Sequence, residues 1–256
     1  SIIRKLLVSH PNIFLLSVED NLQPHVAFFK ENCDFDGFDV DKMIESRNAG
    51  PIFGLSIEKN LNPSLAFLHE RLSHNDVSKV LKSHPQILSL SIDNLREKVT
   101  YFDSLEGDFK DTDSPGETCD TLASKILRRS PSVYSLSLEK SIRPKVDFLA
   151  NIWSVHEDGT TLNTTSVSKH LGQNPSVLSL SLSGNIQPTV RFLNSTGYIH
   201  LDENWHLRCA NSTTLRGRDI ATSLTKRLLP RWHFWRAHMR ELNQEYERLP
   251  YSSVSR

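Results

Sequence analysis

The chain has 256 residues with 30 basic and 30 acidic side chains, so its formal net charge is zero. Its apolar content of 38% supports a sizeable core and excludes a disordered chain. No apolar run reaches the roughly 18 residues of a membrane helix, and the three cysteines lie too far apart for a CxxC pair. We therefore expect a folded protein of a reducing compartment. Because the chain opens with Ser1 inside a motif, we also expect a fragment whose targeting peptide is out of view.

One sequence unit recurs five times within residues 1–200. Each copy contains an apolar residue, a Lys two positions later, a largely apolar pair and a Pro. An L-S-apolar signature follows, and then a segment that starts with Asn or Ser and, in all copies but the third, contains a second Pro. The equivalent lysines are Lys5, Lys42, Lys79, Lys125 and Lys169. They are spaced by 37, 37, 46 and 44 residues, and polar inserts near 103–120 and 154–165 lengthen the last two spacings.

The spacing within each unit predicts a helix, a short helix and a second long helix. In the first part, the apolar positions fall on one helix face and the Lys lies almost opposite. The Pro then ends that helix or opens the next. The L-S signature alternates like a strand, but its flanking prolines fit a short helix or 3₁₀ turn equally well. The third part reads as a helix N-terminus, with Asn or Ser as the cap and Pro in the first turn.

Two solenoid classes fit such a repeat. The L-S-rich segments look like a leucine-rich repeat, whose period is 20–29 residues. The shortest spacing here is 37 residues, which favours a helical solenoid. No unit buries its apolar face alone, so stacked neighbours would form the core.

The pattern P-x-[IV]-[LFY]-x-L-S-[VIL], followed by [NS]-[LI]-x-P-x-[VL]-x-F-[LF], resembles the repeat of the mitochondrial transcription termination factor (mTERF) family. The run LTKRLLPRW, from Leu224 to Trp232, is similar to the closing motif of that family. The resemblance implies an all-α superhelix of three-helix repeats in residues 1–200, with a basic closing repeat and tail in 201–256. It also implies a positively charged groove that binds organellar DNA or RNA. The expected role is in transcription termination or regulation, RNA processing or ribosome biogenesis.

The recurring lysines are the first candidate site. Equivalent helices of a solenoid stack about 10 Å apart, so five lysines would form a row roughly 40 Å long. Phosphates on one strand recur about every 3.4 Å, and such a row would meet every third phosphate. The alternative is that each Lys only solvates an exposed helix face.

A basic C-terminal segment is the second candidate. Residues 204–240 carry eight basic side chains and one acidic side chain, whereas residues 1–203 carry 20 basic and 26 acidic ones. Such an excess is typical of a phosphate-contact surface. The candidate contacts are Arg216, Arg218, Lys226, Arg227, Arg231 and Arg236. Trp232 and Trp235 lie among them and would either stack on bases or form the buried stripe of a capping helix with Leu228 and Met239.

The sequence contains no motif of an active site: no P-loop, GxGxxG, HExxH or GxSxG occurs. We therefore expect no enzymatic activity, no cofactor and no metal. The predicted function is nucleic-acid binding in a mitochondrion or plastid, with double-stranded DNA or RNA as partner, no membrane association and a monomeric state. The alternative is a helical-repeat scaffold that binds a protein and does not contact nucleic acid, which the neutral net charge keeps open.

Overall fold

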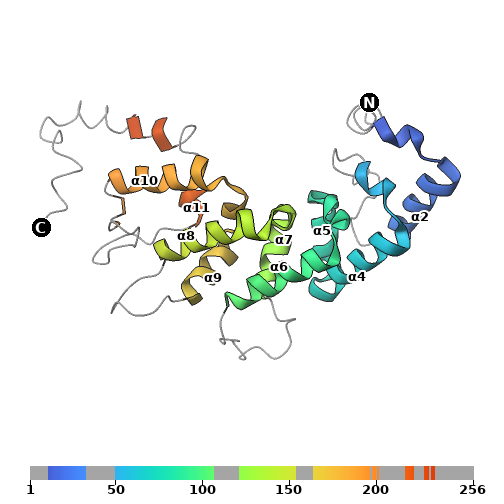
Figure 1. The fold of residues 1–256 in the computed structure, drawn as a ribbon, viewed down its shortest axis with the longest axis horizontal. Coiled ribbons are helices and arrows are strands. Elements are labelled where there is room, and N and C mark those ends of the chain that lie inside the picture. The colour runs from blue at the N-terminus through green and yellow to red at the C-terminus, as the bar shows by residue number, and fades with distance from the viewer. Residues whose placement is uncertain are drawn as a thin grey trace, which may run out of the picture. The chain divides into compact units, whose positions relative to one another are not determined.

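The computed structural model describes residues 11–32, 50–106, 121–153, 164–196, 198–199, 201, 217–221, 228–230 and 232–233. Two compact units divide the chain. The first comprises residues 1–104 and 116–136, and the second comprises residues 105–115 and 137–256. This division by compactness cuts through the fourth repeat, so the predicted boundary at residue 200 stays a prediction. The described segments are helical repeats without a β-strand, as Figure 1 shows, which confirms the predicted all-α class.

None of the helices in the described ranges combines the length and the apolar character that a membrane crossing requires.

The first helix of the repeat is present in the third, fourth and fifth units, as α5 (His74–Ser83), α7 (Leu122–Arg129) and α9 (Thr164–Gln173). Ser73 and Thr121 cap α5 and α7 by accepting the N–H three residues on. Each helix ends two residues before the repeat Pro, because the residue that precedes a Pro is disfavoured in the α region. The predicted first helices of units one and two lie outside the described residues.

The segment that leads into the L-S signature forms a 3₁₀ turn in every unit, not a strand. These turns are η1 (Pro11–Leu15), η3 (Gly50–Gly54), η5 (Pro85–Ser89), η6 (Pro131–Ser135) and η8 (Pro175–Ser179). In the third to fifth units Pro stands at the first helical position, where its missing N–H costs no hydrogen bond. The apolar side chains of η5, Ile87 and Leu88, are fully buried. In the first compact unit, these turns pack in series: η1 contacts η3, η3 contacts η5, and η5 contacts η6.

The long helix begins earlier than the sequence predicts, and its cap is a different residue. The helices are η2 (Val18–Leu22) with α2 (Gln23–Asn32), η4 (Ile57–Leu61) with α4 (Asn62–Arg71), α6 (Ile92–Ser104), η7 (Leu138–Ile142) with α8 (Arg143–Trp153), and η9 (Leu182–Ile186) with α10 (Gln187–Ser195). The Ser of the L-S signature accepts the N–H three residues on in all five, at 3.0–3.3 Å. These caps are Ser17, Ser56, Ser91, Ser137 and Ser181. The interpretation of the later Asn or Ser as the cap is wrong, since that residue lies inside the first turns.

A wide π turn separates the cap from the Pro in four units. Leu61 N–H, for example, donates to the Ser56 carbonyl five residues back, and the same bond recurs in units one, four and five. The third unit is one residue shorter and lacks the Pro, and Leu95 N–H reaches the Ser91 carbonyl four residues back in an ordinary α turn. The extra residue and the Pro therefore occur together. Because Pro has no N–H, the backbone hydrogen bonds can change there from the π pattern to the α pattern without leaving a donor unpaired.

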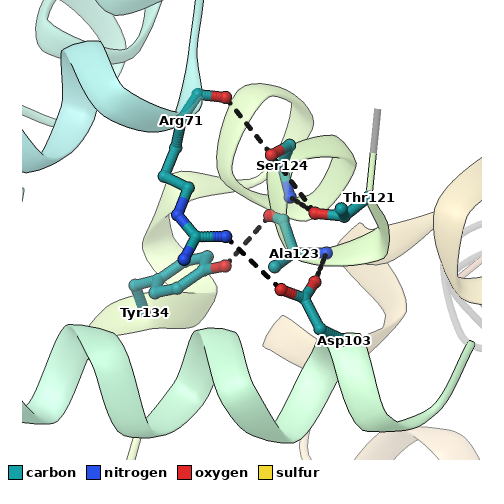
Figure 2. A network of polar contacts seen from close by, with 6 residues as sticks. All are labelled: Arg71, Asp103, Thr121, Ala123, Ser124 and Tyr134. Carbon is teal, nitrogen blue, oxygen red and sulfur yellow. Dashed lines mark hydrogen bonds and ion pairs between the residues drawn. The ribbon is translucent and has the colours of Figure 1, made fainter. Parts of the chain in front are cut away.

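The polar insert near 103–120 lies almost wholly outside the described residues, but its two flanks are held together (Figure 2). The Asp103 carboxylate at the end of α6 accepts from the Ala123 N–H at 3.4 Å and from the Arg71 guanidinium at 3.5 Å. Ser124 Oγ donates to the Arg71 carbonyl, and the buried Tyr134 hydroxyl donates to the Ala123 carbonyl at 2.9 Å. Burial is the main cause that raises the pKa of Tyr134. With both ends anchored, a longer loop costs little additional entropy.

Candidate nucleic-acid interface

The predicted lysine row is only partly within the described chain. Lys79 in α5 and Lys125 in α7 occupy equivalent places on two helices that pack together in the first compact unit. Lys169 occupies the same place on α9 in the second unit. Lys5 and Lys42 lie outside the described residues. Lys79 and Lys125 are therefore the one described pair of recurring lysines on packed helices, and the full row of five stays a prediction.

The three described lysines differ in their surroundings. Lys79 is 70% exposed, and its ammonium donates to Asp76 at 3.1 Å. Lys125 is half-buried, whereas Lys169 is exposed. An exposed ion pair of the Lys79 type contributes about 0–1 kcal/mol. The Lys79 side chain can therefore exchange its carboxylate for a phosphate at small cost.

Asp76 is the acidic partner shared by two basic side chains. Its carboxylate also lies 3.5 Å from the Arg128 guanidinium. Burial by itself raises the pKa of Asp76, but hydrogen bonds from Lys79 and Ser73 and the charges of Lys79 and Arg128 outweigh it, so the pKa is lowered. Asp76 stays ionised at neutral pH and neutralises part of the positive charge on this face.

The basic C-terminal segment is described at few positions. Arg216, Lys226, Arg227, Arg231 and Arg236 lie outside the described residues. The backbone of Arg218 belongs to α11 (Gly217–Ile220), which packs on α9 and η8. A side chain at Gly217 would place its Cβ 2.9 Å from the Cβ of Asn174, so the helix approaches repeat five closely there. The segment thus begins against the fifth repeat.

Trp232 packs on the fifth repeat. Its ring lies 6.2 Å from that of Phe192 in an edge-to-face arrangement at 90°, and its side chain is half-buried. Leu228 is also half-buried. These contacts favour the buried-stripe interpretation for the two residues, and Trp235 and Met239 lie outside the described part.

A column of buried polar residues is the feature that the sequence interpretation missed. The residue that follows the second Pro, or its equivalent in unit three, is polar in every unit. These residues are His25, Ser64, Lys98, Lys145 and Thr189, and their exposed fractions are only 2–6%. The recurrence of a polar residue inside an otherwise apolar segment was the available signal. An isolated Lys in such a segment is usually interpreted as exposed.

Four members of the column bind a carbonyl of the next repeat. Lys98 Nζ donates to the Tyr134 carbonyl at 2.6 Å, and Lys145 Nζ donates to the Leu178 carbonyl at 2.7 Å. Ser64 Oγ donates to Leu88 at 3.4 Å, and His25 Nε2 lies 2.9 Å from the Leu55 carbonyl. Three of these bonds connect a long helix to the following 3₁₀ turn, and the His25 contact reaches the residue directly after η3. The column therefore couples neighbouring repeats.

The buried ammonium groups carry a second contact within their own helix. Lys98 also donates to Asn94 Oδ1, and Lys145 donates to Ser141 Oγ at 2.8 Å. Asn94 and Ser141 are the residues that the sequence suggested as caps, and their actual role is to satisfy these cations. Burial lowers the pKa of both lysines. Lys98 and Lys145 are buried within the repeats and are not part of the row of recurring lysines.

No group of three or more His, Cys, Asp or Glu side chains with metal-binding geometry occurs in the described part of the chain.

In a comparison with known protein families, the model of the mTERF family matches residues 1–107, which contain the first three repeats. The matched range carries three of the five recurring lysines and three of the five buried polar residues. No curated protein shows a significant match.

Proposed function

We infer from this match, which supports membership of the chain in the mTERF family, that the protein binds organellar nucleic acid and regulates gene expression. The family suggests nucleic-acid-associated regulation in an organelle in general. Our finer proposal is that the repeat lysines and the basic C-terminal segment dock along the phosphate backbone of DNA or RNA. Transcription termination, transcription regulation and RNA processing are the candidate outcomes of such docking.

The observation that carries the proposal is the pair Lys79 and Lys125. Both stand at the same position of helices that pack together, so the repeat itself spaces their positive charges. A phosphate backbone is a periodic array of negative charges, and phosphate contacts set position without reading the sequence. Sequence preference would then depend on a few arginines and on the shape of the duplex. In this proposal the protein is a binding protein and not an enzyme, and it acts as a monomer in a mitochondrion or plastid.

The test is the salt dependence of binding. Each phosphate neutralised on duplex DNA contributes about −0.9 to the slope of log affinity against log salt. Changing all five row lysines to Ala should flatten the slope by about 4 to 5 if each of them makes a contact. Lys79→Ala should remove about 0.9, whereas Lys82→Ala, an exposed lysine on the same helix, is the matched control. An unchanged slope in the five-lysine variant would contradict the proposal that the row lysines contact phosphates.

A protein-binding scaffold is the second candidate, and exposed apolar side chains in the first repeat favour it. Phe14 and Leu15 in η1 are 71% and 84% exposed. The equivalents of Phe14 in later repeats, such as Leu88 and Tyr134, are fully buried. If the wild-type chain shows no measurable affinity for nucleic acid even at low salt, that result would favour the protein-binding scaffold.

A further inference from the structure

One cavity, of about 330 Å³, lies between the fourth and fifth repeats within the second compact unit. Lys140 and Lys145 line one side of it, and Ser181, Ser183 and Gln187 line the other. None of the residues that line it, all of them in the described part of the chain, is acidic. The nearby Glu139 is engaged by Arg143 at 2.6 Å. The cavity therefore has a positive lining without an internal counter-charge.

The Lys145 ammonium is the group that makes this cavity unusual. Its side chain is 94% buried, and it donates to the Leu178 carbonyl and to Ser141 Oγ. An ammonium has three N–H donors, and these two acceptors leave one donor for the cavity that Lys145 lines. A buried charge whose donors are not all paired is costly. An anion in the cavity would satisfy the third donor and compensate the charge.

The helix that borders the opposite side lacks the carboxylate that the other repeats carry. The second residue after the Ser cap is Glu19, Glu58, Asp93 and Glu139 in units one to four, and it is Ser183 in unit five. A carboxylate there neutralises the positive end of the helix dipole. In unit five, the Gly184 N–H is held by Ser181 Oγ at 3.1 Å, and the Leu182 and Ser183 amides are the two left for an outside anion beside the cavity they line.

We propose that this cavity is a phosphate subsite that binds one phosphodiester of a nucleic-acid backbone between Lys140, Lys145 and the first turn of η9. The identity of the anion rests on the proposed function. The oxyanion chemistry rests on the cavity itself. Lys140 supplies an exposed charge at the rim, Lys145 supplies a fixed donor inside, and Ser183 leaves the helix end open to a tetrahedral anion.

Two variants test the subsite without disturbing the repeat contact of Lys145. Ser183→Glu restores the acid that four other repeats tolerate, so the variant should fold. It should repel the phosphate and flatten the salt slope by about 0.9. Lys140→Ala should have the same effect. Its matched control is Lys59→Ala: both lysines stand three residues after a Ser cap, but Ser64 replaces the buried ammonium in the repeat of Lys59. A single added acid at the exposed Thr100 controls for Ser183→Glu.

The measurements separate failure of the subsite from failure of the proposed function. Affinity of the full chain is measured over a salt series for labelled DNA and RNA duplexes. Equal slopes for Lys140→Ala and Lys59→Ala, or for Ser183→Glu and Thr100→Glu, would overturn the subsite while nucleic-acid binding stands. A second arm titrates inorganic phosphate and follows the amide resonances of Leu182 and Ser183. Saturable shifts that Ser183→Glu abolishes support the oxyanion site even if wild type binds no nucleic acid, and absence of such shifts in wild type would overturn it.

Discussion

The ammonium of Lys98 donates a hydrogen bond to the carbonyl oxygen of Tyr134 over 2.6 Å, and this bond connects the long helix of the third repeat to the 3₁₀ turn of the fourth. Lys145 makes the equivalent bond to Leu178 one repeat later. Helical repeats generally stack through apolar contacts, and here a polar bond at a fixed position joins them as well. Four members of the column thus link one repeat to the next by a hydrogen bond.

Removing a buried ammonium of the column should destabilise the repeat stack. Lys98→Ala and Lys145→Ala leave a cavity and an unpaired carbonyl, and each should lower the free energy of unfolding by about 2–4 kcal/mol. Lys140→Ala, at an exposed position one turn before Lys145, should change it by about 0.5 kcal/mol or less. Urea denaturation of the purified chain measures these values. Equal stability of Lys145→Ala and Lys140→Ala would contradict the coupling role.

The junction of the first two repeats offers a test of charge at the same position. Both ring nitrogens of His25 face carbonyl oxygens, Nδ1 toward Asn21 at 2.7 Å and Nε2 toward Leu55 at 2.9 Å. Carbonyls only accept, so a side chain with two or more N–H donors can satisfy both. His25→Lys should preserve stability within about 1 kcal/mol, because units three and four place Lys there. His25→Leu should cost about 1–3 kcal/mol, because it leaves both carbonyls unpaired.

The Ser caps should each contribute measurably to stability. Ser137→Ala removes the acceptor of the Lys140 N–H and should lower the free energy of unfolding by about 0.5–2 kcal/mol. Ser137→Asp should retain most of it, because Asp caps a helix equally well. Thermal unfolding followed by circular dichroism distinguishes the two variants. A Ser137→Ala protein as stable as wild type would contradict the cap assignment.

The repeat prolines are boundary residues and not requirements for folding. Pro131 opens η6 with its ring buried, so Pro131→Ala loses apolar contacts and allows a freer unfolded chain. The expected loss is about 1–2 kcal/mol, with a folded, soluble product. The same holds for Pro175→Ala. Loss of all soluble Pro131→Ala protein would show that the ring has a larger role.

Acidification should destabilise the fold through buried histidines. Burial, and secondarily the charge of Lys169, lowers the pKa of His170, whose ring stacks on Trp153 at 4.8 Å. Burial also lowers the pKa of His84. The unfolded chain then binds more protons between the folded pKa and the ordinary value of about 6.5, so the free energy of unfolding rises with pH through that window and falls on acidification.

The variant His170→Phe keeps an aromatic ring on Trp153 and removes this titration. Denaturation midpoints of wild type and variant, measured between about pH 7.5 and pH 5.5, should diverge, with the smaller change in the variant. Parallel curves for the two proteins would contradict a contribution from His170.

The helical class, the repeat unit and the positions of its turns follow from the sequence alone. Apolar residues at helix spacing predict α5, α7 and α9. The prolines predict where these helices stop, because Pro lacks an N–H and restricts the residue before it. The L-S segment is ambiguous in the sequence, because a four-residue alternation fits a strand or a turn. The flanking prolines make a turn possible but do not exclude a strand. The match of the mTERF family model to residues 1–107 supports the predicted resemblance.

Only the tertiary structure decided which polar side chains lie inside. In the sequence, Lys98 and Lys79 are both lysines of amphipathic helices, yet Lys98 is buried and Lys79 is exposed. The difference comes from the carbonyls of the next repeat, which accept the Lys98 ammonium and are distant in the chain. The cap assignment failed because the long helix begins three or four residues before the predicted cap, at a Ser whose hydroxyl accepts the N–H three residues on. Burial and pairing depend on neighbours that folding brings together, so local pattern cannot determine them.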